Sequence, residues 1–409
     1  MKLDRRNFLR NTLSITALTA LAPASVIGND MPDDAMPSRW SFKFLTQPYI
    51  QNPTDNSVTL MWIVSNNAYS FVEYGETESL GKIARTVNDG LVVANNTLNK
   101  ITLKGLKPNT KYYYKAVSKK ISKFDPYDIK FGKTISSEIF SFTTTNPDSL
   151  DVSMAIMNDL HNRSKSIEHL VSFIDKNDTD FVFFNGDILS HIDSEKQIID
   201  DLLEVCGNNF ASEMPFYLVR GNHEVRGEYA REFHEYFSTP SGKQYYDFVY
   251  GGTHFTVIDT GEDKKDSHEV FAGLVDFDSY RQEQLEWFNN EVSKSDSFIN
   301  AKFRVVLMHM PFYYSDEWYG TTTLRKMFAP VFNKTGIDVC ISGHTHESII
   351  KAPSNENGIN HDFAIIIGGG PSKISRTLTK FKANDKELSI SMLDDNGKEI
   401  GSYKTTTKR

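Results

Sequence analysis

The segment between about residues 41 and 145 alternates hydrophobic and polar positions with a period of two, and it contains no helical periodicity of useful length. Residues 57–63 form one such run, directly after a turn cluster at residues 52–56. The other alternating runs are residues 71–75, 101–114 and 139–143. Short strands separated by turns over about 100 residues predict an all-β sandwich. Since no catalytic cluster falls within it, we expect a structural module that packs on its neighbour.

From about Asp151 onward, short hydrophobic runs are separated by segments with helical spacing. The hydrophobic runs are residues 152–157, 181–184, 216–219, 255–258, 304–308 and 337–341. Because these strands are apolar throughout, we expect an α/β domain whose sheet is covered on both faces. After Gly368 the chain returns to alternating strands, which complete this domain. The pattern places the first domain at residues 38–146 and the second at residues 150–409.

The amino-terminal segment has the pattern of an export signal. A basic start precedes an apolar stretch at residues 13–22, and residues 22–24 read Ala-Pro-Ala, a small-x-small cleavage site. The stretch is about half as long as a membrane span, and no Cys lies near the cleavage site to carry a lipid anchor. Residues 5–10, Arg-Arg-Asn-Phe-Leu-Arg, resemble the twin-arginine export motif. We expect residues 1–30 to be a twin-arginine signal and short linker, with an ordinary secretory signal as the alternative, and the mature protein to be periplasmic or extracellular without a transmembrane anchor.

The composition excludes some classes of binding partner and metal site. The chain of 409 residues carries 45 Lys and Arg against 53 Asp and Glu, a formal charge of -8, which argues against broad nucleic-acid binding. Two cysteines are too few for a disulfide framework or a Cys-rich zinc site. The chain also contains eleven His, so imidazole and carboxylate groups are the residues to follow.

Polar clusters follow five of the predicted strands of the second domain. In chain order they are Asp159-Leu160-His161, Gly186-Asp187, Gly221-Asn222-His223-Glu224, His309, and Gly343-His344-Thr345-His346. Taken singly, Asp-x-His is a common capping motif, Gly-Asp is a common turn and His309 could be a core histidine. Gly-His-x-His is a stronger signal, because alternate positions just past a strand can present two imidazoles. Because α/β proteins bind ligands at the carboxyl ends of their strands, we expect the five clusters to converge on one region.

Imidazole and carboxylate ligands without thiolates suit Mn, Fe or Zn. The candidate ligands are Asp159, His161, Asp187, Asn222, His309, His344 and His346. Seven ligands are too many for one ion and suit two, for which a bridging carboxylate is the usual arrangement. Two such ions lower the pKa of a shared water and clamp phosphoryl oxygens, so we expect phosphoester hydrolysis by a bridging hydroxide.

In this order, the five clusters resemble the motif set of calcineurin-like metallophosphoesterases, over roughly residues 151–370. Residues 105–112 resemble the tyrosine corner of fibronectin type III-like modules, and the module with its Trp62 is similar to the one that precedes purple acid phosphatase catalytic domains. The resemblance implies a layered α-β-β-α domain. It also implies one ion held by Asp159, His161 and His346, another held by Asn222, His309 and His344, and a bridging Asp187. His223 would contact the phosphoryl group or protonate the leaving group.

Two positions depart from the purple acid phosphatase pattern. Those enzymes have a tyrosinate ligand where this chain has Ser190, and Gly where it has His161. We therefore expect a non-purple relative with two divalent ions. Ser190 also replaces the Asp that orients the catalytic His in protein phosphatases, which leaves the partner of His223 open, with His191 as one candidate. Arg226 is either a bidentate phosphate ligand or a salt-bridged loop residue.

The leading hypothesis is an exported phosphatase for small phosphomonoesters. The alternative within the enzyme class is a phosphodiesterase or nucleotide hydrolase, because substrate choice lies in loops such as residues 224–245 and 262–280. The alternative outside it is a binding module with a degenerate catalytic domain, against which the full set of seven ligands argues. The aromatic residues at 312–314 and 318–319 either wall the leaving-group site or pack against the sandwich.

Overall fold

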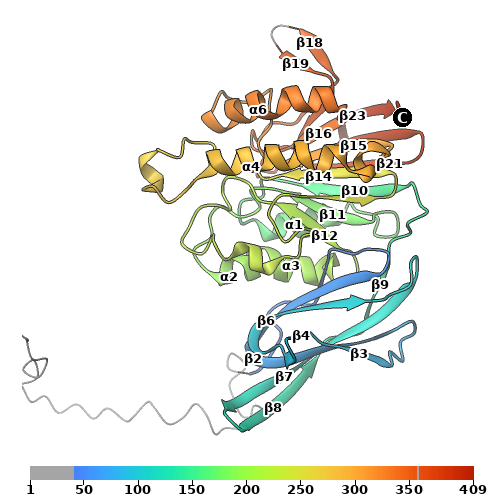
Figure 1. Ribbon diagram of the computed structural model, residues 1–409, viewed down its shortest axis with the longest axis vertical. Helices are drawn as coiled ribbons and strands as arrows, with labels where there is room; N and C mark the ends of the chain where they lie inside the picture. The colour runs from blue at the N-terminus through green and yellow to red at the C-terminus, as the bar shows by residue number, and fades with distance from the viewer. Residues whose placement is uncertain (1–40, 357–358) are drawn as a thin grey trace, which may run out of the picture. The chain divides into compact units, whose positions relative to one another are not determined.

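The computed structural model describes residues 41–356 and 359–409 (Figure 1). The predicted export signal and linker at residues 1–30, and the predicted start of the first domain at residue 38, lie outside the described residues. Residues 42–409 form one compact unit. Among the described helices, none combines the length and the apolar character needed to span a bilayer.

The first part of this unit is β-rich. Its seven-stranded sheet consists of β1 (Tyr49–Gln51), β2 (Ser57–Gly75), β3 (Lys82–Ala84), β6 (Ala94–Lys104), β7 (Lys111–Asp125), β8 (Asp128–Ser136) and β9 (Phe140–Thr143), and β4 (Val87–Asn88) pairs with β5 (Leu91–Val92). The 19-residue β2 pairs with β6 along its first half and with β7 along its second. The sheet thus folds around a core that contains Trp62, whose ring nitrogen donates to Ser118 at 3.0 Å. The backbone N–H of Lys107 donates to the Tyr112 hydroxyl at 3.0 Å, the contact of a tyrosine corner.

The second part contains two six-stranded sheets. In spatial order the first is β12 (Phe216–Val219), β11 (Phe181–Asn185), β10 (Val152–Met157), β21 (Leu378–Ala383), β22 (Glu387–Leu393) and β23 (Glu399–Thr406). The second is β13 (Tyr246–Tyr250), β14 (Thr253–Ile258), β15 (Phe303–Met308), β16 (Val339–Ser342), β20 (Ala364–Ile367) and β17 (Ile349–Lys351). A hairpin of β18 (Ser354–Glu356) and β19 (Ile359–His361) follows β17. The helices are α1 (Ser164–Val171), α2 (Glu195–Ile198), α3 (Glu204–Cys206), α4 (Phe277–Asn290), α5 (Asp296–Ile299) and α6 (Tyr319–Thr335).

Alternate residues of each central strand face different neighbours, which produces the α-β-β-α layers. Phe183 and Leu307, from β11 and β15, lie in the core between the two sheets. Their sequence neighbours face outward: Phe184 packs with the layer of α1 and α3, and Met308 packs with α4 and α6. Burial on both faces explains why these strands are apolar throughout. The pattern alone cannot tell a sheet covered by two helical layers from a sheet covered by helices and a second sheet.

The β-rich part packs on the helical layer of the first sheet. Met61 belongs to a core cluster that also contains residues of α1 and α3. The Tyr49 hydroxyl donates to the carbonyl of Tyr236 at 2.8 Å, and the Tyr114 hydroxyl donates to the carbonyl of Ser212 at 2.7 Å. Both hydroxyls are buried and satisfied, so this contact joins two ordered surfaces.

Candidate metal centre

The carboxyl ends of strands from both sheets bring the predicted residues together. Strands β10, β11 and β12 run parallel in one sheet, and β15 and β16 run parallel in the other. Three groups of His and Asp side chains form there, and within each group the ligand atoms lie within 4.8 Å of one another. The groups are Asp159, His161 and His346; His161, Asp187 and His223; and Asp187, His309 and His344. Asn222 joins them through its side-chain oxygen, 3.0 Å from Nδ1 of His344. All seven predicted ligands and His223 therefore meet in one region.

Asp187 occupies the middle of this region. Its Oδ2 lies 3.1 Å from Nε2 of His309 and 4.0 Å from Nε2 of His161, which belong to different halves of the centre. Its Oδ1 accepts a hydrogen bond from the backbone N–H of His223 at 2.9 Å, so the carboxylate is fixed at one oxygen. A buried carboxylate between two sets of ligands has the position required of a bridge.

Two buried atoms show that the centre fits a cation. The carbonyl of Asn185 is a pure acceptor, so Nδ1–H of His309 donates to it at 2.9 Å, which leaves Nε2 facing Oδ2 of Asp187 at 3.1 Å, where it holds either a proton or a metal ion. Nε2 of His309 and Oδ1 of Asp159 are both buried and have no hydrogen-bond partner. Buried polar atoms are almost always paired, and electron-rich atoms that face one another are stabilised by a positive ion between them.

Hydrogen bonds to Oδ2 fix the orientation of the Asp159 carboxylate. Oδ2 accepts from the backbone N–H of His344 at 2.8 Å and from the side chain of Asn158 at 2.7 Å. Asn158 is itself held by the carbonyl of Gly369 at 2.8 Å. Oδ1 is thereby left toward Nε2 of His346, at 3.3 Å. Partners of this kind orient metal ligands. Sequence reasoning missed Asn158, for which the only signal was its position next to Asp159.

A second residue that sequence reasoning missed is Glu224, which holds the backbone of Asp187 by a hydrogen bond. Its buried carboxylate accepts backbone hydrogen bonds from Asp187 at 2.9 Å, Leu189 at 2.7 Å and Gly221 at 2.7 Å. One side chain thus ties the turn after β11 to the turn after β12. Burial and the neighbouring Asp187 charge raise the pKa of Glu224 to about 7, against the effect of these bonds. Glu224 stood in the Gly-Asn-His-Glu motif, but nothing in the sequence gave it this role.

Burial dominates the electrostatics of two imidazoles. Burial lowers the pKa of His161 and of His344 to about 4, although nearby carboxylates act in the opposite direction. Both rings are therefore neutral at pH 7, the form that binds a metal. For His309, burial also lowers the pKa, but the charges of Asp187 and Asp159 outweigh it and raise the pKa to about 10. The carboxylates thus create a site that attracts positive charge.

The backbone of the centre is strained. The candidate ligands with φ in the left-handed region are Asp159 (52°), His161 (48°), Asp187 (53°), His344 (74°) and His346 (61°). This conformation costs an ordinary residue about 1–2 kcal/mol. Such strain clusters at functional sites, where the rest of the fold maintains it. All five residues lie in the turns that follow β10, β11 and β16.

Three glycines of the motifs are required by close packing. A Cβ added to Gly186, Gly221 or Gly343 would lie under 3.0 Å from the side chain of His309, Asp187 or Asp159, respectively. A residue with a side chain at any of these positions would displace a candidate ligand.

The partner of His223 is a main-chain group. Nδ1–H of His223 donates to the carbonyl of Ser190 at 2.8 Å. The backbone of Ser190 therefore supplies the hydrogen-bond acceptor that orients His223, in place of a carboxylate side chain at this position. His191 instead lies beside Asp193, at 3.1 Å, and is not the partner. Nε2 of His223 faces the centre, 3.9 Å from Oδ2 of Asp187.

Arg226 forms a salt bridge, one of the two alternatives predicted for it, and phosphate binding stays a prediction. Its Nε donates to Oε2 of Glu262 at 3.0 Å and its Nη2 donates to Oε1 at 2.5 Å, a bidentate ion pair with a carboxylate that is fully buried. Nη1 lies outside this ion pair and donates to Nε2 of His223 at 3.1 Å. The ion pair therefore fixes a guanidinium at the edge of the centre. Glu262 is a third residue that sequence reasoning missed.

The aromatic segment after His309 also divides. Phe312 and Tyr313 are buried in the core under α6. Tyr314 and Trp318 line a cavity of about 320 Å³ that also borders His344. The predicted packing against the sandwich is therefore wrong for Phe312 and Tyr313, which pack under α6, while Tyr314 and Trp318 lie beside the centre.

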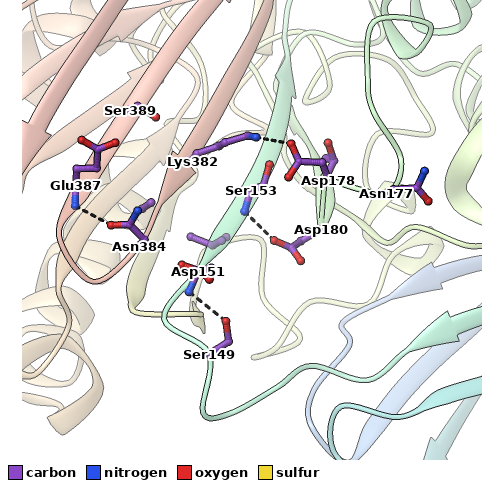
Figure 2. A pocket seen from close by; sticks show the side chains of 13 residues that line it. Ser149, Asp151, Ser153, Asn177, Asp178, Asp180, Lys382, Asn384, Glu387 and Ser389 are labelled. Atoms are coloured by element: carbon purple, nitrogen blue, oxygen red, sulfur yellow. Dashed lines mark hydrogen bonds and ion pairs between the residues drawn. The ribbon is translucent and has the colours of Figure 1, made fainter.

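A larger cavity, of about 440 Å³, lies at the other ends of the strands (Figure 2). It borders Asp151 and Ser153 at the start of β10, and none of the candidate ligands lines it. Its polar groups are paired with one another: Asp180 accepts from the backbone of Ser153 at 2.7 Å, and Lys382 contacts Asp178. This cavity is separate from the centre.

Two protein-family models match the chain. Residues 152–348 match the model described as calcineurin-like phosphoesterase, and residues 46–144 match the model described as purple acid phosphatase, N-terminal domain. Both domains of the predicted resemblance are therefore confirmed.

Curated relatives have low sequence identity to this chain, but the matches extend over most of it. The chain is similar to probable purple acid phosphatase 20 of Arabidopsis thaliana, 23% identical over 374 residues, which cover 85% of this chain and 78% of that protein. It is also similar to purple acid phosphatase 15 of the same plant, 22% identical, with 76% of this chain and 58% of that protein covered.

Solved structures share the fold at lower identity. Purple acid phosphatase PPD1 from yellow lupin (Lupinus luteus) seeds gives a TM-score of 0.64 at 17% identity, over 88% of this chain and 74% of that one. PhoD gives a TM-score of 0.60 at 14% identity, over 91% and 90%. These similarities confirm the predicted two-domain fold.

Proposed function

Residues 152–348 form a calcineurin-like phosphoesterase domain behind a purple acid phosphatase N-terminal domain, and we propose that this metallophosphoesterase hydrolyses small phosphomonoesters at a centre of two divalent ions. Asp159, His161 and His346 would hold one ion, and Asn222, His309 and His344 the other, with Asp187 as the bridge. The observation that carries the proposal is the buried Asp187 carboxylate between the two ligand sets. Divalent ions at such a site activate a water and bind phosphoryl oxygens.

His223 would move the proton in this reaction. Its Nδ1 is committed to the Ser190 carbonyl, so Nε2 is the atom that exchanges a proton, and Nε2 faces the centre. Hydrolysis of the P–O bond leaves an alkoxide or phenoxide oxygen that must be protonated. For this general-acid role Nε2 must take up a proton, and the Arg226 N–H that now donates to it must turn to a phosphoryl oxygen when substrate binds.

Arg226 would bind a phosphoryl oxygen. Its guanidinium lies beside His223 and is held from behind by Glu262. Nη1 is the group that a phosphoryl oxygen can reach once the substrate is bound. A monoester has three oxygens that carry no ester group, one more than a diester, so a donor outside the ion pair favours the monoester.

Export is part of the proposal. It is supported by the sequence of residues 1–24 alone, with the twin-arginine motif as the preferred route to the periplasm or beyond.

The proposed function is tested by turnover of p-nitrophenyl phosphate against bis-p-nitrophenyl phosphate, using chelated protein supplied with Mn, Zn or Fe. We expect metal-dependent hydrolysis with the monoester preferred. Faster hydrolysis of the bis-ester would show a phosphodiesterase. If elemental analysis finds bound metal but neither ester is hydrolysed, the protein is a binding module and the proposal is wrong.

A further inference from the structure

The cavity of about 320 Å³ beside the candidate centre is lined by two chain segments that each follow a predicted ligand. Tyr314, Ser315, Asp316 and Trp318 lie between His309 and α6, and His344, Thr345 and Glu347 lie after β16. His344 belongs to both the cavity and the centre. On the proposed function, a phosphoryl group at the centre therefore has this cavity beside it, and the leaving group has a place to enter.

One aromatic ring of the cavity is held firmly. The Tyr314 hydroxyl donates to Nε2 of the buried His361 at 2.9 Å, and Nδ1 of His361 donates to the carbonyl of Phe363 at 2.7 Å. Tyr314 also has φ at +61°, a conformation that is costly for an aromatic residue. Fixed rings are effective partners for cations, and Nζ of Lys351 already lies 5.5 Å from the centre of this ring.

The second ring, Trp318, is 48% exposed and lines the same cavity. Indole is the aromatic group that attracts cations most strongly. The two rings offer flat apolar area with a negative face, which suits an alkylammonium group as well as a neutral ring.

The two charged side chains that line the cavity are both negative, whereas Lys351, 5.5 Å from the Tyr314 ring, lies outside the lining. Asp316 and Glu347 line the cavity, while no Lys or Arg does so within the described part of the chain. The adjacent Glu317 is neutralised by Arg325, whose Nη1 donates to it at 2.8 Å. No ion pair involves the side chain of Asp316 or Glu347 among residues 41–356 and 359–409. A second anionic group on the leaving side of a substrate would therefore be repelled here.

We propose that this cavity receives the leaving group of the substrate and prefers one that carries an alkylammonium charge, of the choline or ethanolamine class, over an anionic one. Water adds to phosphorus, the P–O bond to the amino alcohol breaks, and the alcohol oxygen takes up a proton, so the products are inorganic phosphate and the free amino alcohol. The inference rests on the proposed function for the reaction, and on the cavity for the choice of leaving group.

The test compares two substrates that differ by one atom. Phosphocholine and 3,3-dimethylbutyl phosphate have the same shape, with nitrogen or carbon at the branch point, and p-nitrophenyl phosphate serves as a neutral reference. We expect kcat/KM for phosphocholine to exceed that for its carbon analogue by about two- to fivefold for each cation contact. Turnover of 3-phosphoglycerate, whose leaving group is anionic, should be the slowest.

Variants of the cavity lining test whether this cavity causes the preference for phosphocholine over its carbon analogue. In Asp316→Asn and Glu347→Gln the ratio of the two kcat/KM values should fall toward one, and Trp318→Leu should lower it as well. Glu317→Gln is the matched control, since Glu317 belongs to the same segment but is paired with Arg325, and it should leave the ratio unchanged. A wild-type ratio of one or less, or a ratio that the cavity variants leave unchanged, would overturn the inference.

A binding measurement separates this inference from the proposed function. Saturation-transfer NMR should show choline binding more tightly than 3,3-dimethylbutanol, with the difference lost in the Asp316→Asn, Glu347→Gln double variant. If p-nitrophenyl phosphate is not hydrolysed but choline still binds in this way, the proposed reaction is wrong and the cation site stands. If p-nitrophenyl phosphate is hydrolysed and choline has no advantage over the alcohol, only the cation site is wrong.

Discussion

Among single residues, Asp187 determines the geometry of the centre. It is shared by two of the three ligand groups, its Oδ1 is fixed by the backbone of His223, and its own N–H is held by Glu224. Burial raises the pKa of Asp187, but the neighbouring His309 charge outweighs burial and the pKa is lowered, so the carboxylate is ionised. An ionised, buried and fixed carboxylate is suited to join two cations.

Replacement of Asp187 by Ala should therefore remove both ions. After dialysis against metal-free buffer, elemental analysis should find close to two metal ions per chain in the wild type and close to none in Asp187→Ala. Glu283→Ala, which removes a carboxylate on α4 outside the centre, should leave the metal content unchanged. A full pair of ions in the Asp187 variant would show that it is not the bridge.

The His223→Ala variant should lose activity and keep its metal. General acid catalysis by a positioned side chain contributes about 100- to 10,000-fold, so kcat for p-nitrophenyl phosphate should fall by that factor. His223 is assigned to the proton and not to the ions, hence elemental analysis should give the wild-type metal content. Loss of metal together with activity would refute this assignment.

Gly343→Ala should weaken the centre through packing. The new methyl group would lie under 3.0 Å from the Asp159 carboxylate, so that side chain must move, at a cost of about 1–3 kcal/mol in the free energy of unfolding. We expect a lower midpoint in chemical denaturation and weaker metal binding. Gly252→Ala is the control, because its Cβ would approach the Lys302 side chain at 3.2 Å and the Leu150 carbonyl at 3.3 Å, and no neighbouring atom under 3.0 Å. Equal effects of the two substitutions would argue against specific packing under Asp159.

At the scale of elements, the centre depends on turns that follow strands of two different sheets. Glu224 joins the turn after β11 to the turn after β12, and Asn158 joins the turn after β10 to the segment after β20. The turn after β14 contributes Glu262, which holds Arg226 beside His223. These side-chain contacts between turns maintain the ligands in their left-handed conformations.

Glu262→Gln should loosen Arg226 and weaken phosphate binding. The charge-assisted bidentate pair is replaced by neutral hydrogen bonds, and we expect KM for p-nitrophenyl phosphate to rise by about tenfold, from a loss of about 1–2 kcal/mol. The inhibition constant of inorganic phosphate should rise in parallel, while kcat changes less than KM.

The control for Glu262 is Glu317→Gln, which breaks another Arg–Glu bidentate pair away from His223. It should leave the KM for p-nitrophenyl phosphate and the phosphate inhibition constant unchanged. If Glu262→Gln lowered only the thermal stability, with KM and the inhibition constant unaltered, Arg226 would be structural.

For the whole molecule, candidate ligands from the two sheets mean that bound ions would link the two halves of the α-β-β-α domain. Asp159, His161 and Asp187 follow the first sheet, and His309, His344 and His346 follow the second. Ligands that bind only the folded state stabilise it by mass action. The ions should therefore contribute to global stability as well as to chemistry.

Metal removal should lower Tm. An ion present at a thousand times its Kd stabilises the folded state by about 4 kcal/mol, so a chelator should lower the Tm measured by calorimetry and added Mn or Zn should restore it. The chelator should leave the Tm of Asp187→Ala unchanged, since that variant has no ions to lose. A wild-type Tm that is insensitive to chelation would show that the ions do not join the sheets.

The sequence determined the two-domain fold and the composition of the centre. Period-two alternation and uniformly apolar strands follow directly from whether one or both faces of a strand are buried. The polar residues at strand ends were identifiable because parallel strands bring their carboxyl ends together. These features depend on residues that are neighbours in the sequence, so Asp187 and His309 could be predicted as metal ligands without a structure.

Only the tertiary structure decided which groups support and surround these ligands. The Ser190 carbonyl at His223, the Glu262 carboxylate at Arg226, and the cavity between Tyr314 and Glu347 join residues that are far apart in the chain. The backbone strain at the ligands and the lack of space at Gly186, Gly221 and Gly343 are also invisible in the sequence. Such contacts depend on how turns from two sheets meet, and a pattern along one strand contains no information about a turn on another.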